Sequence, residues 1–362
     1  MAPRQAQRGA LPTAPLRSDF ARTTIRIVGW LFCLELVSGI LQGYYVPLIP
    51  RLVEHLGITD AEFNWFEAGQ LLVSALSVPL LAKLGDMFGH KRMLLVATVL
   101  TAAFTWWLAF ANDFTTFLIA WSLTGFYAVW LPLEIALIFD RGRATGIGAA
   151  TTRRAAGTLV LALQLGAFAG ALLGRRVLGW TGDDVALTMI VPAIAVTLVF
   201  FAILFGVPES TPLRGRSLDL TGFVLLGLAL VGITAGLRLM SVNGPDAWWT
   251  WLVVAAGLLL LLPFGWWELR QRDPAIDLRV LRARSMWPVQ LTAGLVGVSL
   301  LGAQAPLATF AATDPEEVVD GRPLGYGLGL DDTSLVIGGY ILSLAVGALL
   351  FAILSRRIAP RA

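Results

Sequence analysis

Long apolar runs recur along this chain and constrain its fold more than any other feature. Each run approaches the roughly 20 residues that an α-helix needs to cross the hydrocarbon core of a bilayer. Hydrophobic residues make up 57% of the sequence and charged residues only 14%, so a water-soluble fold would leave much apolar surface uncovered. The sequence therefore predicts an all-α, polytopic membrane bundle of about ten transmembrane helices, at residues 26–50, 63–84, 93–111, 114–138, 156–178, 185–206, 218–240, 248–267, 287–312 and 334–354.

The positive charges are distributed unevenly between the two ends of these runs. When successive runs alternate in direction, most of the 27 lysines and arginines fall on the side of the amino terminus. Cytoplasmic loops carry such an excess of cations. The pattern predicts a multi-pass protein of the cell (plasma or inner) membrane with both termini in the cytoplasm, and it places an acidic loop at 314–332 on the outer side.

Changes in composition divide the chain into segments. Residues 1–24 are rich in arginine and proline and predict a disordered cytoplasmic tail. Residues 25–206 predict an N-terminal six-helix bundle, and a cytoplasmic linker at 207–217 leads to two further transmembrane helices at 218–267. A basic cytoplasmic linker at 268–286 then precedes the last two runs, in residues 287–362.

Residues 82–92, which we call the charged segment, separate the second and third runs. Gly85 and Gly89 permit a tight bend, and Asp86 is placed to accept hydrogen bonds at a helix end. Lys91 and Arg92 supply cations where a cytoplasmic loop prefers them. On spacing alone, an ordinary positive-inside loop accounts for the charged segment as well as a functional motif does.

The order Asp86-x-x-Gly89-x-Lys91-Arg92 after an apolar helix resembles the loop between the second and third helices of the major facilitator superfamily of transporters. Three further patterns resemble its fourteen-helix drug:proton antiporter branch: V-P-E-S at 207–210, L-D-L-x-G at 218–222 and E-x-x-x-x-D-P at 268–274. The resemblance implies the major facilitator fold, a cytoplasmic gate at the charged segment, and proton-coupled efflux of small hydrophobic or amphipathic compounds. The chain departs from the branch at Ala82, at Trp121 in place of a membrane arginine, and at Gly170-Ala171 in place of Gly-Pro.

The resemblance also implies six helices after the basic linker, where this sequence has two runs. Residues 287–362 are therefore interpreted as the first two helices of an incomplete C-terminal bundle, in a chain that is truncated or is completed by a second chain. Two alternatives to drug efflux stay open. One is a truncated, non-transporting membrane protein or a subunit that needs a partner chain, and the other is a facilitator-type transporter of another solute.

Polar residues inside the apolar runs are candidates for substrate and proton binding. Glu35 lies about nine residues into the first run, or roughly 14 Å deep at 1.5 Å per residue, near the bilayer midplane. A lone charged carboxylate is costly there, so Glu35 is a candidate proton carrier, and a structural hydrogen bond to a neighbouring helix is the alternative. Gln42 lies two turns further along on much the same face, and Gln70 and Gln164 are weaker candidates for the same cavity.

Glu134 lies near the inner end of the fourth run, where solvation at the membrane interface is the simplest interpretation. The nearby Asp140 and Arg141 suggest a charge network with the charged segment, so we also assign Glu134 to the predicted gate. Glu67, one turn into the second run, receives the same interfacial interpretation.

The fifth run contains the repeat Gly166-x-x-x-Gly170-x-x-x-Gly174. Small residues at this spacing form a smooth helix face and let another helix approach closely. The repeat predicts a helix-packing surface.

The sequence contains few of the residue patterns that soluble enzymes and metal-binding proteins use. The sequence has no glycine-rich phosphate loop with a lysine, and its two histidines and single cysteine form no metal-ligand pattern. We therefore expect no enzyme activity, cofactor, metal site or nucleic-acid partner. The expected partners are a small-molecule substrate, protons, the lipid bilayer and possibly a second chain.

Overall fold

A computed structural model describes residues 14–354, apart from 144–147, 213–214, 302–306, 308–309, 312, 314–317, 320–321 and 324. Helices dominate this part of the chain, which confirms the predicted all-α bundle. The first eight α-helices and two 3-10 turns are α1 (Ala14–Tyr44), η1 (Val46–Leu48), α2 (Ile49–Leu56), α3 (Asp60–Phe88), α4 (His90–Leu108), α5 (Phe114–Thr124), η2 (Gly125–Val129), α6 (Trp130–Arg143), α7 (Gly148–Trp180) and α8 (Val185–Gly206). They are followed by α9 (Leu220–Asn243), α10 (Trp248–Glu268), α11 (Leu278–Leu281), α12 (Trp287–Leu301), the paired strands β1 (Val318–Val319) and β2 (Arg322–Pro323), and α14 (Leu330–Leu354).

Seven helical stretches of the described residues are long and apolar enough to span a membrane. They coincide with seven of the ten predicted spans. The other three predicted spans are occupied by α4, α12 and α14. α4 has 19 residues and begins with His90, Lys91 and Arg92, which make its first turn polar.

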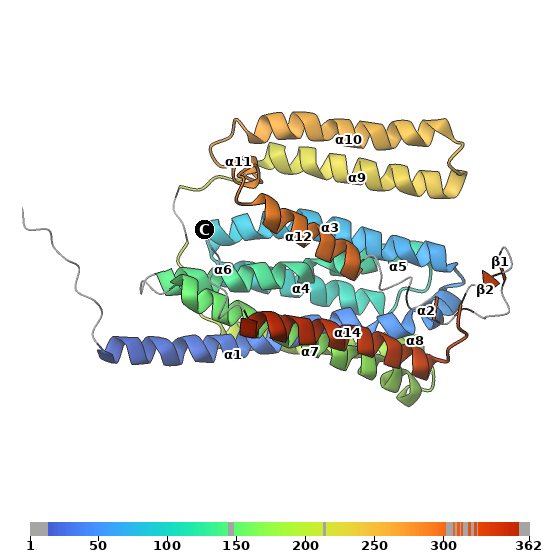
Figure 1. The fold of residues 1–362 in the computed structure, drawn as a ribbon, viewed down its shortest axis with the longest axis horizontal. Helices are drawn as coiled ribbons and strands as arrows, with labels where there is room; N and C mark the ends of the chain where they lie inside the picture. The colour runs from blue at the N-terminus through green and yellow to red at the C-terminus, as the bar shows by residue number, and fades with distance from the viewer. Residues whose placement is uncertain are drawn as a thin grey trace, which may run out of the picture.

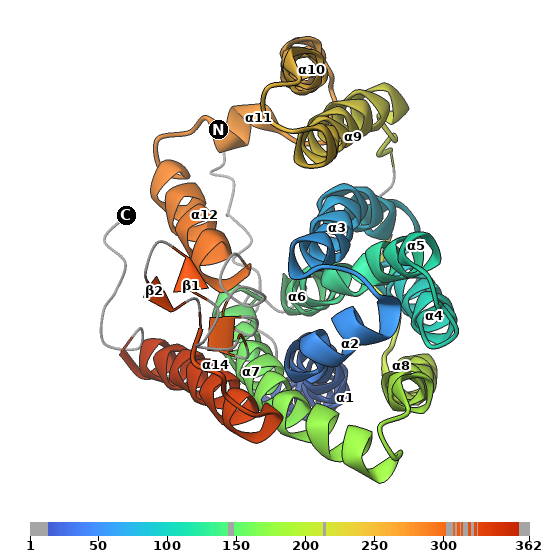
Figure 2. The ribbon, with the colours of Figure 1, turned by 90° about the vertical axis from the view of Figure 1, so that its right-hand side faces the viewer.

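The long helices run side by side (Figure 1). Viewed from one end, α14 lies against α7, and the α9–α10 pair stands beside α3 at the periphery of the bundle (Figure 2). The helices from α1 to α8 together enclose a continuous cluster of buried apolar side chains. The residues predicted as the N-terminal six-helix bundle therefore share a single core.

Several predicted boundaries were wrong. The structure carries α1 back to Ala14, so residues 14–24, predicted as a disordered tail, are helical, and residues 1–13 lie outside the described part. Pro15 stands at the first turn, where the missing N–H of proline costs nothing. The bend in the charged segment is confined to Gly89, because α3 continues to Phe88 and α4 begins at His90. The fourth run is divided by η2 into α5 and α6, and Pro132 lies in the first turn of α6, where proline is tolerated.

The turn from α4 to α5 is short, as its sequence predicts. The Asp113 carboxylate caps α5 and accepts hydrogen bonds from the N–H groups of Thr115 at 3.0 Å and Thr116 at 3.1 Å. The Thr116 hydroxyl donates to the same carboxylate and, with these N–H groups, holds the pKa of Asp113 below its usual range. The cap fixes α4 and α5 as antiparallel neighbours.

The glycine repeat of α7 packs against α1, as its spacing predicts. A Cβ atom on Gly166 or Gly174 would collide with the backbone carbonyl of Leu36 or Tyr44, and one on Gly170 would lie 2.5 Å from the Ile40 oxygen. On α1, Gly39 and Gly43 meet the α7 backbone in the same way. The two helices therefore touch backbone to backbone, which only glycine allows at these positions.

Lys83 connects the end of α3 to the chain beyond α10. Its side chain is 7% exposed, and its Nζ donates to the backbone carbonyls of Asp273 at 2.5 Å and Pro274 at 2.6 Å. The same region holds Asp219, whose carboxylate accepts from Trp267 Nε1 at 2.9 Å, and the buried Glu268, whose Oε2 accepts from the Ile276 N–H at 3.3 Å. The Lys83 bonds attach the segment after α10 to α3, and the bonds of Asp219 and Glu268 hold α9, α10 and that segment together.

Replacing Lys83 with methionine should loosen this attachment. The substitution keeps the length of the side chain but removes the donor of two hydrogen bonds to the partly buried Asp273 and Pro274, and charge-assisted hydrogen bonds contribute about 2 kcal/mol each. We expect a fall of several degrees in the melting temperature of the purified protein. Arg51→Met, which removes only the exposed pair of Arg51 with Glu54, should change the melting temperature little. Equal melting temperatures for the two variants would contradict the attachment.

Candidate functional site: a buried carboxyl pair and a capped charged segment

Glu35 on α1 and Glu134 on α6 lie together inside the bundle. Both side chains are 0% exposed, and their carboxyl groups are close enough to interact directly. The interfacial interpretation of Glu134 was therefore wrong, because protein encloses this side chain completely. η2 places Tyr127 nearby, where its phenol interacts electrostatically with Glu35 and with Glu67 of α3. Glu67 is partly buried.

Of the three predicted glutamines, Gln70 has a hydrogen-bond partner on a neighbouring helix. Gln70 Nε2 donates to the hydroxyl of Thr124 at 2.8 Å, which is a structural bond between α3 and α5. Gln42 and Gln164 are partly buried on α1 and α7. The structure thus pairs Glu35 with Glu134, whereas the substrate-cavity role of the three glutamines stays a prediction.

Trp121, at the position that resembles the family's membrane arginine, stands in an aromatic cluster. Its ring centroid lies 5.0 Å from that of Tyr45, 5.5 Å from Phe63, 5.7 Å from Phe117 and 6.4 Å from Phe66. Trp121 is 5% exposed. Packed aromatic rings therefore fill the space in which an arginine would need water or a counter-ion.

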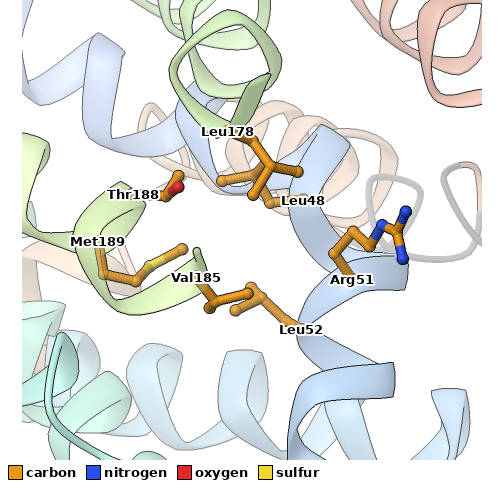
Figure 3. Close-up of a pocket in the computed structure, with 7 residues that line it drawn as sticks. All are labelled: Leu48, Arg51, Leu52, Leu178, Val185, Thr188 and Met189. Carbon is orange, nitrogen blue, oxygen red and sulfur yellow. The ribbon is translucent and has the colours of Figure 1, made fainter. Parts of the chain in front are cut away.

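A small hollow opens at the end of the bundle where α7 turns into α8 (Figure 3). It holds about 150 Å³ of empty space, whereas sites for drug-sized ligands usually measure about 300–1,000 Å³. The hollow is therefore no substrate site for such a compound. Arg51 borders the hollow, but its guanidinium extends away from it. The rest of the lining is mainly apolar and consists of Leu48, Leu52, Leu178, Val185 and Met189, with Thr188.

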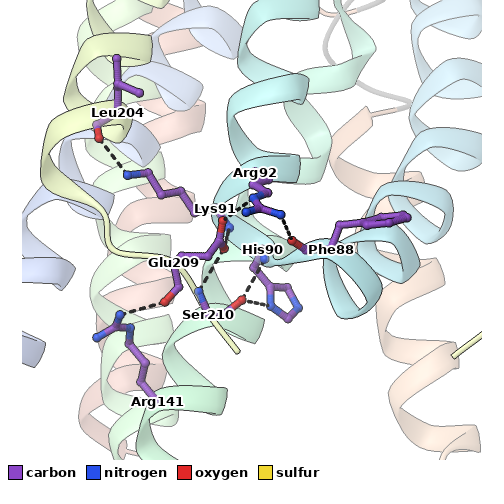
Figure 4. Close-up of polar contacts among 8 residues, drawn as sticks. All are labelled: Phe88, His90, Lys91, Arg92, Arg141, Leu204, Glu209 and Ser210. Carbon is purple, nitrogen blue, oxygen red and sulfur yellow. Dashed lines mark hydrogen bonds and ion pairs between the residues drawn. The ribbon is translucent and has the colours of Figure 1, made fainter. Parts of the chain in front are cut away.

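The segment after α8 caps the charged segment (Figure 4). Glu209 Oε1 accepts from the Lys91 N–H at 2.9 Å, and Ser210 Oγ accepts from the His90 N–H at 2.8 Å. The carboxylate of Glu209 also lies 3.7 Å from Arg92 Nε. An anion at the first free N–H groups of α4 is stabilised by the helix dipole as well as by hydrogen bonds.

Further contacts tie the charged segment to α6 and α8. Arg141 Nη2 donates to the Glu209 carbonyl at 3.0 Å, and Lys91 Nζ donates to the Leu204 carbonyl at 2.8 Å. The His90 ring stands between two carboxylates, 3.4 Å from Asp86 Oδ1 and 3.3 Å from Asp140 Oδ2. The predicted network of Arg141 and Asp140 with the charged segment therefore exists, but Glu134 belongs to the carboxyl pair.

Sequence reasoning assigned the helix-end acceptor role to Asp86 and missed Glu209 and Ser210. Asp86 contacts His90 from the last turn of α3, while Glu209 and Ser210 accept from the N–H groups of α4. A signal was present, because V-P-E-S puts an acidic residue and a hydroxyl directly after an apolar run. Nothing local in the sequence showed which helix end they meet.

Gly89→Ala should be more damaging than the same change at another left-handed glycine. Gly89 has a φ of 107°, and a Cβ there would lie 2.6 Å from the Glu209 carboxylate. We expect a loss of about 3 kcal/mol in stability, from backbone strain together with the displaced cap. Gly57→Ala, with a φ of 62° and nothing within 4 Å of the new atom, should cost about 1 kcal/mol. Thermal unfolding of both variants measures the difference, and a smaller loss at Gly89 would refute the close approach.

Residues 31–362 match the sequence profile described as the Major Facilitator Superfamily. The chain belongs to the major facilitator superfamily. It is a multi-pass membrane protein of that family, and the predicted membership of the superfamily is thereby confirmed.

The curated relatives of this chain include bacterial proteins that are named as transporters. The uncharacterized MFS-type transporter YwoD of Bacillus subtilis is 27% identical over 240 residues, covering 64% of this chain and 49% of the relative. The multidrug resistance protein MdtG of Escherichia coli is 30% identical over 190 residues, 51% of this chain and 44% of the relative. A multidrug resistance protein B homolog of Mycobacterium tuberculosis is 24% identical over 255 residues, 69% and 46% of the two chains. The chain thus spans about half the length of the curated relatives it matches.

Among solved structures, the crystal structure of the human organic anion transporter MFSD10 (TETRAN) is similar, with a TM-score of 0.46 and 16% identity. The match covers 92% of this chain and 94% of that chain.

Proposed function

We propose that this family member acts in proton-coupled export of small hydrophobic or amphipathic compounds. The observation that carries the proposal is Glu35, a carboxyl group fully enclosed inside a membrane-spanning bundle. Ionisable groups at such depth are costly and mark ion pathways in transporters. Relatives named as multidrug resistance proteins support export as the direction and drug-like compounds as the substrate class.

In this mechanism Glu35 carries the proton that drives export. The carboxyl group keeps its proton while the protein encloses it, because a lone charge there costs several kcal/mol. Secondary transporters bind substrate near the bilayer midplane and expose that site to the two sides in turn. Substrate that enters beside Glu35 displaces the proton, and reloading from the outer side restores it.

A second candidate is a subunit that completes its transport path with another chain, or a remnant that does not transport. A facilitator for another solute is a third candidate, and the half-buried glutamines Gln42 and Gln164 suit a polar solute as well as a drug.

Dye retention in bacterial cells that lack their own exporters separates these candidates. Cells that produce the chain should retain less ethidium, and an uncoupler of the proton gradient should abolish the difference. Retention that stays unchanged by the chain would contradict export. Co-purification of the tagged chain with an untagged membrane subunit would favour the second candidate.

The predicted orientation is testable by cysteine labelling. In a Cys33→Ser background, Arg284→Cys in the basic linker and Asp332→Cys in the first turn of α14 place single exposed thiols at two sites. An impermeant reagent added to intact cells should label only Asp332→Cys, since the positive-inside pattern predicts a cytoplasmic linker. Labelling of Arg284→Cys in intact cells would reverse the orientation.

A further inference from the structure

Glu35 and Glu134 meet as two acceptors without a donor. They extend from neighbouring helices, α1 and α6, and their carboxyl groups lie within hydrogen-bonding reach of each other. Among the described residues, no N–H or O–H group donates to any of their four oxygens. Buried carboxylates in folded proteins normally have such partners.

A proton resolves this arrangement. Two ionised carboxylates in contact repel each other, and both lose their hydration when protein encloses them. When one carboxyl group is protonated, it becomes an O–H donor and its neighbour accepts the bond. We propose that Glu35 and Glu134 form one proton-binding site, in which a single proton is held in a hydrogen bond between the two carboxyl groups.

The other charged or titratable groups on the surrounding elements are not part of the Glu35–Glu134 pair. Tyr127 of η2 interacts electrostatically with Glu35, and it interacts as well with Glu67 of α3. On α4, His90 contacts Asp86 and Asp140 at the charged segment. α8 carries no charged residue, and the described part of α7 carries two exposed cations near its beginning and two near its far end, Arg153, Arg154, Arg175 and Arg176.

The shared proton deepens the proposed function, because it names the second residue of the coupling site. It also joins two helices. Loss of the proton would leave two adjacent negative charges, so the contact between Glu35 and Glu134 holds α1 and α6 together when the pair is protonated and repels when it is not. The proton site itself is a property of the folded bundle and does not require transport.

Infrared spectroscopy of the purified chain in lipid nanodiscs tests the pair directly. The protonated-carboxyl band is followed against pH for the wild type, Glu35→Gln, Glu134→Gln and the double variant. Each single substitution should change the pH at which the remaining carboxyl group loses its proton by at least about one unit, since groups that share a proton titrate as a pair. The double variant should lack the band of the pair, and Glu67→Gln should retain it.

An unchanged titration of Glu35 in Glu134→Gln would overturn the proposal. If a glutamine variant fails to fold, Glu134→Asp keeps the charge but withdraws the carboxyl group by one methylene, and it should also change the titration. Coupled titration without dye export would refute the proposed function and leave the shared site intact. Dye export with independent titrations would refute the shared site alone.

Discussion

Gly170→Leu should reduce the yield of folded protein at least about tenfold. The new side chain would begin against the backbone of Ile40 and Tyr44, with contacts at 2.5 to 3.0 Å already for its Cβ. Overpacking a tight contact costs about 1–3 kcal/mol even when side chains can move aside, and backbone atoms cannot. The measurement is the monodisperse fraction on size-exclusion chromatography of the detergent-solubilised chain.

Gly179→Leu is the matched control on the same helix. A Cβ at Gly179 meets nothing within 4 Å, and leucine favours the helix by roughly 0.8 kcal/mol over glycine. We expect wild-type yield or better for this variant. Similar yields for the two leucine variants would show that α1 and α7 do not pack through their glycines.

Glu35→Gln should reduce pH-gradient-driven substrate flux to the background rate while substrate binding persists. Glutamine keeps the size and hydrogen-bonding capacity of glutamic acid but cannot release a proton. Flux driven by a substrate gradient alone should continue. Glu67→Gln, which removes a partly buried carboxylate outside the pair, should retain gradient-driven flux. Undiminished gradient-driven flux in Glu35→Gln would leave Glu35 only a structural role.

The sequence predicted the helices and the glycine contact because both depend on local periodicity. Apolar length indicates a span, and a four-residue glycine spacing places small residues on one helix face. The burial of Glu134 was misjudged because the apolar run ends at residue 138 whereas α6 continues to Arg143. Charged residues in the last turns of a helix hide its true end in a hydropathy pattern.

Local sequence patterns could not predict which residues from distant segments contact each other. Glu209 and Lys91 are 118 positions apart in sequence, and the sequence alone gave no means of bringing them together. The contact of Glu35 with Glu134 is of the same kind, since it depends on how α1 and α6 face each other. Trp121 was recognised as a departure from the family, and of its cluster partners Phe117 lies on its own helix, α5. Tyr45, between α1 and η1, and Phe63 of α3 come from distant segments.

Proton-coupled export is tested most directly by flux into proteoliposomes that contain the purified wild-type chain. A pH gradient is imposed across the vesicle membrane, and ethidium and internal pH are followed together. The proposal predicts dye accumulation against its concentration gradient with proton movement in the opposite direction, and neither signal when the gradient is collapsed. Equal dye movement with and without the pH gradient would contradict proton coupling.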